Sequence, residues 1–254
     1  MELHPDIDLG GFPIYVTMAF VGAVAAILIA LFNINRFEGK DQVKKYLFIP
    51  FMAVAFIIGF FCANIGNWFV IPGKLLLPLM ERIQTSGFAF YFGIIGFFIS
   101  VIIILAVARM DIPSYLNLMV PSVLLFHAFG RIGCSLAGCC FGVPLRPPVD
   151  LGIFTLFYFP AREIEALSLF AMFFITQYGI KKRRMLFYAI AYPVVRFLLE
   201  FGRGDLRGRM FTDIFSPAQE ISIIILFGVL VYGVIKLIVH IKKKSRPADP
   251  SVPA

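Results

Sequence analysis

Seven long apolar runs follow one another along the 254-residue chain and strongly limit what it can fold into. They span residues 12–35, 47–71, 88–108, 114–134, 164–180, 185–201 and 217–240. An α-helix needs about 20 such residues to cross the hydrocarbon core of a bilayer. Hydrophobic residues make up 60% of the chain and charged residues only 15%, against about 25% charged residues in an ordinary soluble domain. The sequence therefore predicts an all-α membrane protein with about seven transmembrane helices.

Basic residues are concentrated in alternate connections between these runs. They are Arg36, Lys40, Lys44, Lys45, Arg109, Lys181, Lys182, Arg183, Arg184, Lys242, Lys243, Lys244 and Arg246. Cytoplasmic connections of membrane proteins are enriched in Lys and Arg, so we expect an extracytoplasmic N-terminus and a cytoplasmic C-terminus. The acidic start of the chain also lacks the basic region of a cleavable signal peptide. The net charge of +8 then reflects topology and gives no case for nucleic-acid binding.

No soluble domain is visible, so residues 1–245 are expected to form a single polytopic transmembrane domain. The segment around 141–161 contains Pro144, Pro147, Pro148 and Pro160, which cannot all lie inside one helix. We expect it to form an irregular extracytoplasmic loop or cap. Residues 246–254 are proline-rich and are expected to form a disordered cytoplasmic tail.

A first group of polar residues lies at the end of the fourth apolar run. His127 and Arg131 are four residues apart, which places them on one helix face. Ionisable side chains inside a membrane are costly and mark functional sites by default. We therefore expect Arg131 to face a protein interior or an anion.

A second group lies in the sixth apolar run, where Tyr192, Arg196, Glu200 and Arg203 are spaced by four, four and three residues. This spacing places them on one face of a helix. Together with Arg131, two or three arginines oppose one glutamate, which leaves positive charge for a phosphate that guanidinium groups bind in bidentate geometry. The alternative is an Arg196–Glu200 ion pair that only neutralises itself between helices.

Three cysteines follow Arg131 closely: Cys134, Cys139 and Cys140. They could pack tightly beside the neighbouring glycines, or form a disulfide on an oxidising side of the membrane. A metal site is the least favoured interpretation, because Cys-x4-Cys-Cys lacks the paired ligands of structural zinc sites. We therefore expect no metal and no other cofactor.

These residues together resemble the prolipoprotein diacylglyceryl transferase family. Residues 130–142 are similar to its signature Gly-Arg-x-x-Asn-Phe-x-Asn-Gly-Glu-x-x-Gly, and the second polar group matches its Tyr-x-x-x-Arg-x-x-x-Glu-x-x-Arg. Residues 86–96 resemble its Gly-Gly-x-x-Phe-His-Gly-Gly-x-x-Gly, and Tyr15 falls where the family has a first-span tyrosine. Gln219 closes a segment that resembles its Ser-x-Gly-Gln.

Several positions depart from the family pattern and indicate a divergent branch. Tyr91 stands where the family has a histidine, and Phe92 replaces the next glycine. Cys134 and Ala137 replace two asparagines, and Cys139 replaces a glutamate. The family's His-Pro-Thr-Gln-Leu-Tyr-Glu segment is represented only by Phe-Pro-Ala-Arg-Glu-Ile-Glu at residues 159–165. The arginines that the family pattern assigns to phosphate binding are thus retained. The residues that it assigns to acid/base chemistry and to the acceptor are changed.

The resemblance implies transfer of a diacylglyceryl group from phosphatidylglycerol, or another anionic phospholipid, to a lipobox cysteine thiol. The acceptor would be a secreted lipoprotein precursor, glycerol phosphate would be released, and the enzyme would be a multi-pass protein of the bacterial cytoplasmic membrane. One alternative is a related transferase with a glycan or lipid acceptor. Another is a non-catalytic protein that binds or transports phospholipid.

The expected site combines both polar groups with the positions matched to the family. We expect catalytic roles for His127, Arg131, Arg196, Glu200 and Tyr91. We expect substrate binding by Tyr15, Tyr192, Arg203, Cys134, Cys139, Gly142 and Gln219. His127 is the candidate base for the acceptor thiol, because it shares a helix face with Arg131 and could replace the missing histidine. The alternative for His127 is a structural histidine, and Tyr91 is more suited to hydrogen bonding a phosphate.

Overall fold

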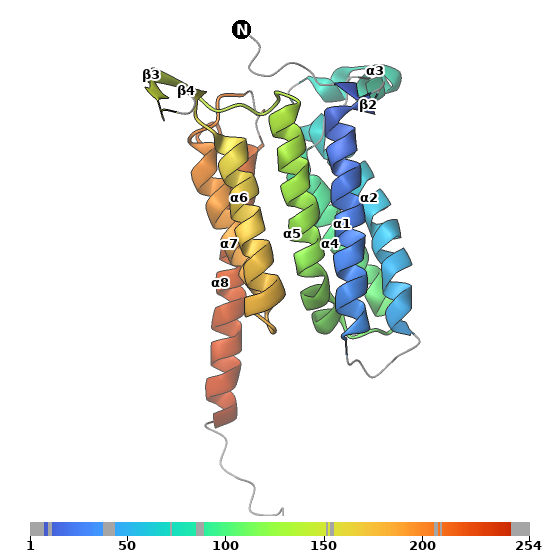
Figure 1. The fold of residues 1–254 in the computed structure, drawn as a ribbon. Helices are drawn as coiled ribbons and strands as arrows, with labels where there is room; N and C mark the ends of the chain where they lie inside the picture. Colours follow the sequence, from blue (N-terminus) through green and yellow to red (C-terminus); the bar gives the residue numbers. More distant parts are fainter. Residues whose placement is uncertain are drawn as a thin grey trace, which may run out of the picture.

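The computed structural model describes residues 8–9, 12–37, 44–71, 73–84, 89–150, 152, 155–205, 208 and 210–244. Within these ranges the chain is mainly helical (Figure 1). The helices are α1 (Ile14–Asn35), α2 (Phe48–Val70), α3 (Leu79–Gln84), α4 (Phe90–Val107), α5 (Ile112–Leu136), α6 (Ala161–Phe174), α7 (Arg184–Glu200) and α8 (Pro217–Lys244). The strands are β1 (Asp8–Leu9), β2 (Phe12–Pro13), β3 (Pro144–Asp150) and β4 (Thr155–Tyr158).

Each of the seven apolar runs coincides with one of the longer helices, which confirms the all-α membrane fold. Five of them, α1, α2, α4, α5 and α8, are long and apolar enough to cross a membrane. Helix α6 has 14 residues and continues into a π-helical turn, Ile175–Gly179, and α7 has 17 residues. Seven crossings therefore stay a prediction that depends on α6 and α7.

The long helices run alternately up and down through one bundle (Figure 1). Helix α5 packs against α1 and α6, while α2 packs against α4 and α7 against α8. The α2–α4 contact depends on small residues, because a Cβ atom added to Gly93 would lie 2.9 Å from the Cβ of Ala63. Such close backbone approach is typical of helices packed in membranes. The outward faces carry exposed apolar side chains, such as Phe20, Val107 and Phe227, which suits contact with lipid.

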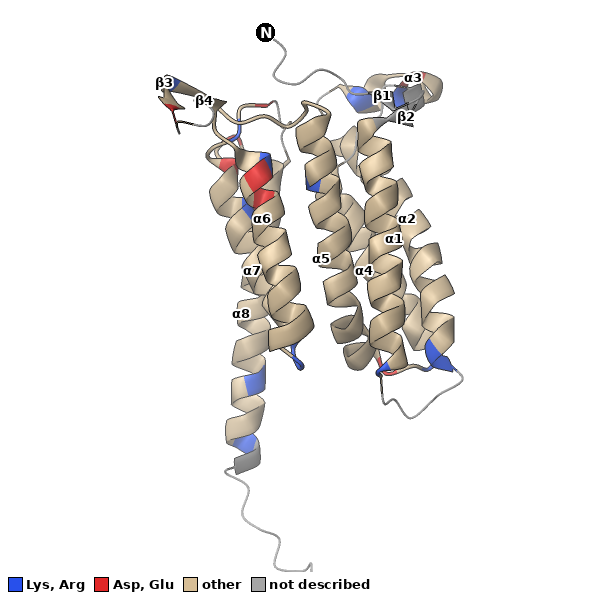
Figure 2. Cartoon of the chain, viewed as in Figure 1, with Lys and Arg blue, Asp and Glu red and all other residues tan. Residues whose placement is uncertain are grey.

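The basic residues of the alternate connections lie at one end of the bundle, while other basic residues lie inside it and at the opposite end (Figure 2). Lys44 and Lys45 precede α2, Arg109 follows α4, residues 181–183 connect α6 to α7, and Lys242 lies near the end of α8. The assignment of this end to the cytoplasm stays a prediction. The predicted tail at 246–254 lies outside the described residues.

The proline-rich segment at the opposite end is a β-hairpin rather than the irregular loop expected from the sequence (Figure 1). Strands β3 and β4 pair antiparallel, with Val149 opposite Leu156 and Asp150 opposite Thr155. Both strands of a two-stranded sheet have a free edge, where proline is tolerated because no partner requires its missing N–H group. The non-helical character of the segment is thus confirmed, and its extracytoplasmic location stays a prediction.

Candidate active site

The carboxylate of Glu165 on α6 lies at the centre of the polar cluster. It is fully buried. Its Oε1 accepts a hydrogen bond from the hydroxyl of Tyr192 at 3.1 Å and lies 3.0 Å from Nε of Arg131. Its Oε2 lies 3.5 Å from Nη1 of Arg196 and 3.7 Å from Nη1 of Arg203. One carboxylate therefore gathers three arginines from separate parts of the chain.

Helix α7 and the turn after it supply most of the other side chains. Tyr192, Arg196 and Glu200 follow one another at four-residue intervals and lie on one face of α7, as their spacing predicts. Arg203 lies in the following turn, where its backbone forms a β-bridge with Gly142. The two groups of polar residues expected from the sequence are thus brought together.

Gly142 supports this arrangement through its backbone. A Cβ atom at this position would collide with the carbonyl of Phe159, so only glycine fits between the hairpin and the turn after α7. The adjacent Val143 N–H donates to the carbonyl of Gly202 at 2.9 Å. Gly142 therefore positions Arg203, and direct substrate binding by Gly142 stays a prediction.

The positive charge of the cluster is more fully balanced than the sequence spacing suggested. Arg196 Nη2 lies 2.9 Å from Oε2 of Glu200, and Arg203 Nε donates to Oδ1 of Asp205 at 3.2 Å. Glu165 on α6 is a second glutamate carboxylate in the cluster. The sequence comparison of two or three arginines with one glutamate did not include it. The Arg196–Glu200 pair expected as the alternative is present, but Arg196 also contacts Glu165. Burial raises the pKa of the Asp205 carboxyl, and the neighbouring Arg203 guanidinium opposes this shift.

A cavity of about 230 Å³ opens beside these side chains. Its polar lining comes from Tyr91, Arg131, Cys140, Arg196, Glu200, Arg203 and Asp205. Its apolar lining includes Val70, Phe92 and Ile221. The volume is below the roughly 300–1,000 Å³ of pockets for drug-sized ligands, so the cavity is large enough for a phosphate-containing headgroup but not for two acyl chains.

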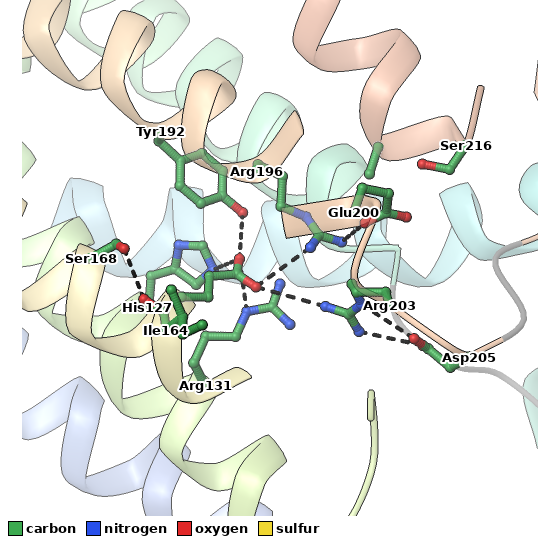
Figure 3. Close-up of polar contacts among 12 residues, drawn as sticks. His127, Arg131, Ile164, Ser168, Tyr192, Arg196, Glu200, Arg203, Asp205 and Ser216 are labelled. Atoms are coloured by element: carbon green, nitrogen blue, oxygen red, sulfur yellow. Dashed lines mark hydrogen bonds and ion pairs between the residues drawn. The ribbon is translucent and has the colours of Figure 1, made fainter. Parts of the chain in front are cut away.

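Two guanidinium groups are directed at this cavity without full engagement of their donors. Arg131 contacts Glu165 through Nε, and its terminal nitrogens point toward Arg196 and Arg203 (Figure 3). The buried Nη1 of Arg203 has no hydrogen-bond partner among the described residues. This atom lies 3.7 Å from Oε2 of Glu165, and binding of a ligand by Arg203 stays a prediction.

Tyr91 lines the cavity, and the catalytic role expected for it stays a prediction. Its hydroxyl lies 2.7 Å from Oγ of Ser222 on α8, and its ring centroid lies 6.0 Å from that of Tyr192. The hydroxyl of Tyr192 contacts Glu165. Tyr91 is therefore placed to contact a substrate, whereas Tyr192 orients the central carboxylate.

His127 joins the cluster but does not line the cavity. Its ring stacks on Phe90 with centroids 4.0 Å apart, and Nε2 lies 3.9 Å from Oε1 of Glu165. Neither ring nitrogen forms a hydrogen bond within the described part of the chain. The proximity to Arg131 expected from the sequence is thus present, and a role as base stays a prediction.

The remaining expected site residues lie at the edges of the cluster. The ring of Tyr15 packs beside Gly133 of α5, where an added Cβ atom would lie 3.3 Å from it. The side-chain oxygen of Gln219 accepts a hydrogen bond from the Ser216 N–H at 3.1 Å, which caps α8. Among the cysteines, Cys140 lines the cavity, although Cys134 and Cys139 were the ones expected to bind substrate. Substrate contacts of Tyr15, Gln219, Cys134 and Cys139 stay predictions.

Sequence reasoning missed Glu165 and Asp205 as members of the site. Glu165 lies one turn into α6, close to Glu163 and Arg162. In the sequence it therefore looks like one of the charged residues that are common at helix ends. The usable signal was the family segment at residues 159–165, whose last glutamate is retained although most of the segment differs. No comparable signal marked Asp205.

Comparisons with known proteins show which family the chain belongs to. A sequence profile described as prolipoprotein diacylglyceryl transferase matches residues 7–235. The phosphatidylglycerol–prolipoprotein diacylglyceryl transferase of Clostridium tetani is 30% identical over 236 residues, which cover 87% of this chain and 92% of that protein. A protein named phosphatidylglycerol–prolipoprotein diacylglyceryl transferase 2 from Clostridium perfringens is 33% identical, covering 63% of this chain and 66% of its own.

A third relative, the phosphatidylglycerol–prolipoprotein diacylglyceryl transferase of Campylobacter jejuni subsp. doylei, is 27% identical and covers 74% of this chain and 76% of its own. The profile match spans nearly the whole described chain, including every helix that contributes to the cluster around Glu165. The chain therefore belongs to the prolipoprotein diacylglyceryl transferase family.

Proposed function

We propose that this chain is a membrane transferase that moves the diacylglyceryl group of phosphatidylglycerol to the cysteine thiol of a secreted lipoprotein precursor. The names of the relatives and the extent of the family match support this reaction. The single observation that carries the proposal is the convergence of Arg131, Arg196 and Arg203 at a cavity of headgroup size.

The cavity suits the phosphoglycerol part of the lipid. Planar guanidinium groups bind phosphate oxygens in bidentate geometry, and Arg131, Arg196 and Arg203 all line the cavity. The acyl chains do not fit in about 230 Å³ and lie outside, against the apolar helix surfaces. Glu165 keeps the three guanidinium groups together before the lipid arrives, which avoids reorganising them during binding.

The reaction transfers a carbon from oxygen to sulfur. The acceptor sulfur forms a bond to the terminal glycerol carbon of the diacylglyceryl group, the bond from this carbon to the phosphate oxygen breaks, and its electron pair leaves with glycerol phosphate. The proton lost by the thiol balances the additional negative charge that glycerol phosphate gains when this bond breaks. Negative charge therefore grows on the phosphate in the transition state, where interactions accelerate a reaction most. Arg131, Arg196 and Arg203 stabilise that charge.

The reaction requires both substrates to reach one side of the membrane. The cavity is lined by Arg203, whose backbone pairs with Gly142 just before β3, and Figure 2 shows the β3–β4 hairpin at the bundle end opposite the basic connections. With the basic end in the cytoplasm, the cavity lies near the outer face of the bacterial cytoplasmic membrane. A secreted precursor and the lipids of the outer leaflet both reach this position.

Reconstitution with defined substrates tests the proposal. Proteoliposomes that contain phosphatidylglycerol are mixed with a peptide that bears a lipobox cysteine, and glycerol phosphate and peptide mass are measured. We expect stoichiometric release of glycerol phosphate and a gain of one diacylglyceryl group. The matched peptide with serine in place of cysteine should stay unmodified.

Two results would overturn this reaction for the chain. Release of glycerol phosphate while the cysteine peptide remains unmodified, with a glycan or lipid product instead, would assign a different acceptor. Saturable binding of phosphatidylglycerol without any release would assign a lipid-binding protein.

A further inference from the structure

Three thiols form a compact group beside the cavity. The sulfur atoms of Cys134, Cys139 and Cys140, called here the cysteine cluster, all lie within 4.8 Å of one another. All three are free thiols. The spacing in the sequence had argued against a zinc site of the paired type, but the fold brings the three sulfur atoms together from a helix end and the turn that follows it.

The turn that forms the cysteine cluster has a specific backbone conformation. The Cys139 N–H donates to the carbonyl of Cys134 at 3.2 Å. Gly138 has a φ of 69°, and Cys140 has a φ of 61°. A left-handed conformation is unfavourable for a residue with a side chain and occurs mainly where surrounding structure enforces it. In this case it turns the Cys140 sulfur toward the other two sulfur atoms.

A buried arginine fixes this turn from the outside. Arg162 donates through Nη1 to the carbonyls of Cys134, at 3.3 Å, and Cys139, at 2.8 Å. Its Nε lies 3.4 Å from Glu163, which also accepts a hydrogen bond from the hydroxyl of Ser135. Such supporting contacts around ligand residues are typical of metal sites, where they orient the ligands.

The geometry fits a thiophilic divalent cation with one open position. Zinc–sulfur bonds of about 2.3 Å place tetrahedral thiolate sulfurs about 3.8 Å apart, so sulfur atoms within 4.8 Å need to move by only about 1 Å. Three protein ligands with a fourth position for water or substrate are characteristic of catalytic rather than structural zinc sites.

The open position would face the proposed lipid site. Cys140 lines the same cavity as Arg131 and Arg203. Three thiolates around a divalent cation carry a net charge of −1, which these arginines offset. A thiol bound at the cysteine cluster therefore lies beside the place proposed for the phosphate.

We propose that the cysteine cluster binds Zn²⁺ and that its fourth position takes the acceptor cysteine as a thiolate. This proposal rests on the proposed function, because it supplies the activated sulfur of that reaction. The acceptor thiol loses its proton to solvent on binding the metal. Its sulfur then attacks the glycerol carbon, and the electron pair of the broken carbon–oxygen bond leaves with the phosphate.

The expected increase in turnover when the metal is bound follows from the ionisation of the acceptor thiol. A thiol with a pKa near 8.5 is only about 3% ionised at pH 7, whereas a metal-bound thiol is fully deprotonated. Metal removal should therefore lower turnover by up to about 30-fold at pH 7, and by only about twofold at pH 8.5, where half of the free thiol is already ionised.

The metal site is tested without turnover by titrating the reduced, full-length protein in detergent with Co²⁺. We expect one Co²⁺ per chain and a near-ultraviolet sulfur-to-cobalt charge-transfer band, which Zn²⁺ abolishes by displacement. Cys139→Ala and Cys140→Ala should weaken this band strongly. Cys62→Ala is the matched control, because Cys62 lies on α2 outside the cluster, and should leave the band unchanged.

The fourth position is tested by adding acceptor peptides to the Co²⁺-loaded protein. The lipobox cysteine peptide should shift the band, and its serine counterpart should not. An unchanged band with both peptides would overturn the acceptor-binding role. Absence of Co²⁺ binding, an undiminished band in Cys139→Ala, or a disulfide within the cluster of the active enzyme would overturn the metal site.

The two proposals fail differently. If the cysteine peptide shifts the cobalt band but the metal-loaded proteoliposomes release no glycerol phosphate, the proposed function is wrong while the thiol-binding metal site stands. If glycerol phosphate is released at the same rate with and without a chelator across pH 7–8.5, the metal proposal is wrong and the transferase stands.

Discussion

At the scale of single residues, the site depends on one buried carboxylate that opposes several guanidinium groups. The positions of Arg131 and Arg196 could be predicted because intramembrane charge and four-residue spacing are local properties of the sequence. The central position of Glu165 could not, because it results from the packing of α6 against α5 and α7. The distance from Glu165 to these arginines depends on tertiary packing, so it cannot be inferred from the spacing of residues within one helix.

Glu165→Gln should be strongly destabilising. It keeps the shape of the side chain but leaves Arg131, Arg196 and Arg203 without their shared anion, and breaking a buried ion pair costs about 3–5 kcal/mol. Added phosphatidylglycerol should raise the melting temperature of this variant more than that of the wild type, because its phosphate supplies the missing charge. Asp111→Asn, at an exposed position that makes no side-chain capping hydrogen bond to α5, is the control. An unchanged melting temperature in Glu165→Gln would contradict the central role of this carboxylate.

His127→Gln distinguishes the two roles considered for this histidine. Because His127 is covered by Phe90 and does not line the cavity, we expect a lower melting temperature and less than a tenfold loss of turnover per folded molecule. Thermal unfolding and the rate of glycerol phosphate release measure the two effects separately. A loss of about 10²–10⁴ in turnover, with normal stability, would instead support the base role.

At the scale of elements, the helices could be predicted better than their contacts. Apolar runs of sufficient length form helices in a membrane regardless of their neighbours, because every backbone polar group must be satisfied within the element. The β3–β4 hairpin could not be predicted in the same way, since its pairing joins residues such as Val149 and Leu156 across a turn. The cysteine cluster was missed for a similar reason, because the turn at Gly138 decides the distances between its sulfur atoms.

Gly93→Leu tests the close packing of α2 against α4. A Cβ atom at this position already lies 2.9 Å from the Cβ of Ala63, so we expect overpacking to cost about 1–3 kcal/mol. Gly228→Leu on α8 is a matched control, because a Cβ atom there meets nothing within 4 Å. Only Gly93→Leu should lower the melting temperature, which is measured by thermal unfolding in detergent. Equal melting temperatures for the two variants would show that the helices do not pack this closely.

At the scale of the whole molecule, the alternating direction of the helices separates two chemically different ends. Basic connections lie at one end and the β3–β4 hairpin lies at the other (Figure 2), and Arg203, which lines the cavity, pairs with Gly142 just before that hairpin. The sequence predicted this separation from charge alone, because Lys and Arg mark alternate connections. It could not predict that the site also draws on α2, which contributes Asn67 and Val70 to the lining of the cavity.

Cysteine labelling in sealed cells tests this topology. In a chain whose native cysteines are replaced, single cysteines are placed at Gly152 in the hairpin and at Lys182 between α6 and α7, both exposed. An impermeant thiol reagent outside the cells should modify only the cysteine at position 152, and membrane permeabilisation should then allow modification at position 182. Labelling of position 182 in sealed cells would reverse the assigned orientation.

The most direct test of the central claim is the rate of glycerol phosphate release from phosphatidylglycerol by Arg196→Lys proteoliposomes. Lysine keeps the positive charge but loses the planar fork that binds two oxygens, so we expect the rate to fall roughly 10²–10³-fold. The control Arg36→Lys changes an exposed arginine directly after α1 and should keep the wild-type rate. A wild-type rate in folded Arg196→Lys would contradict the claim that the arginines recognise the phosphate of the lipid.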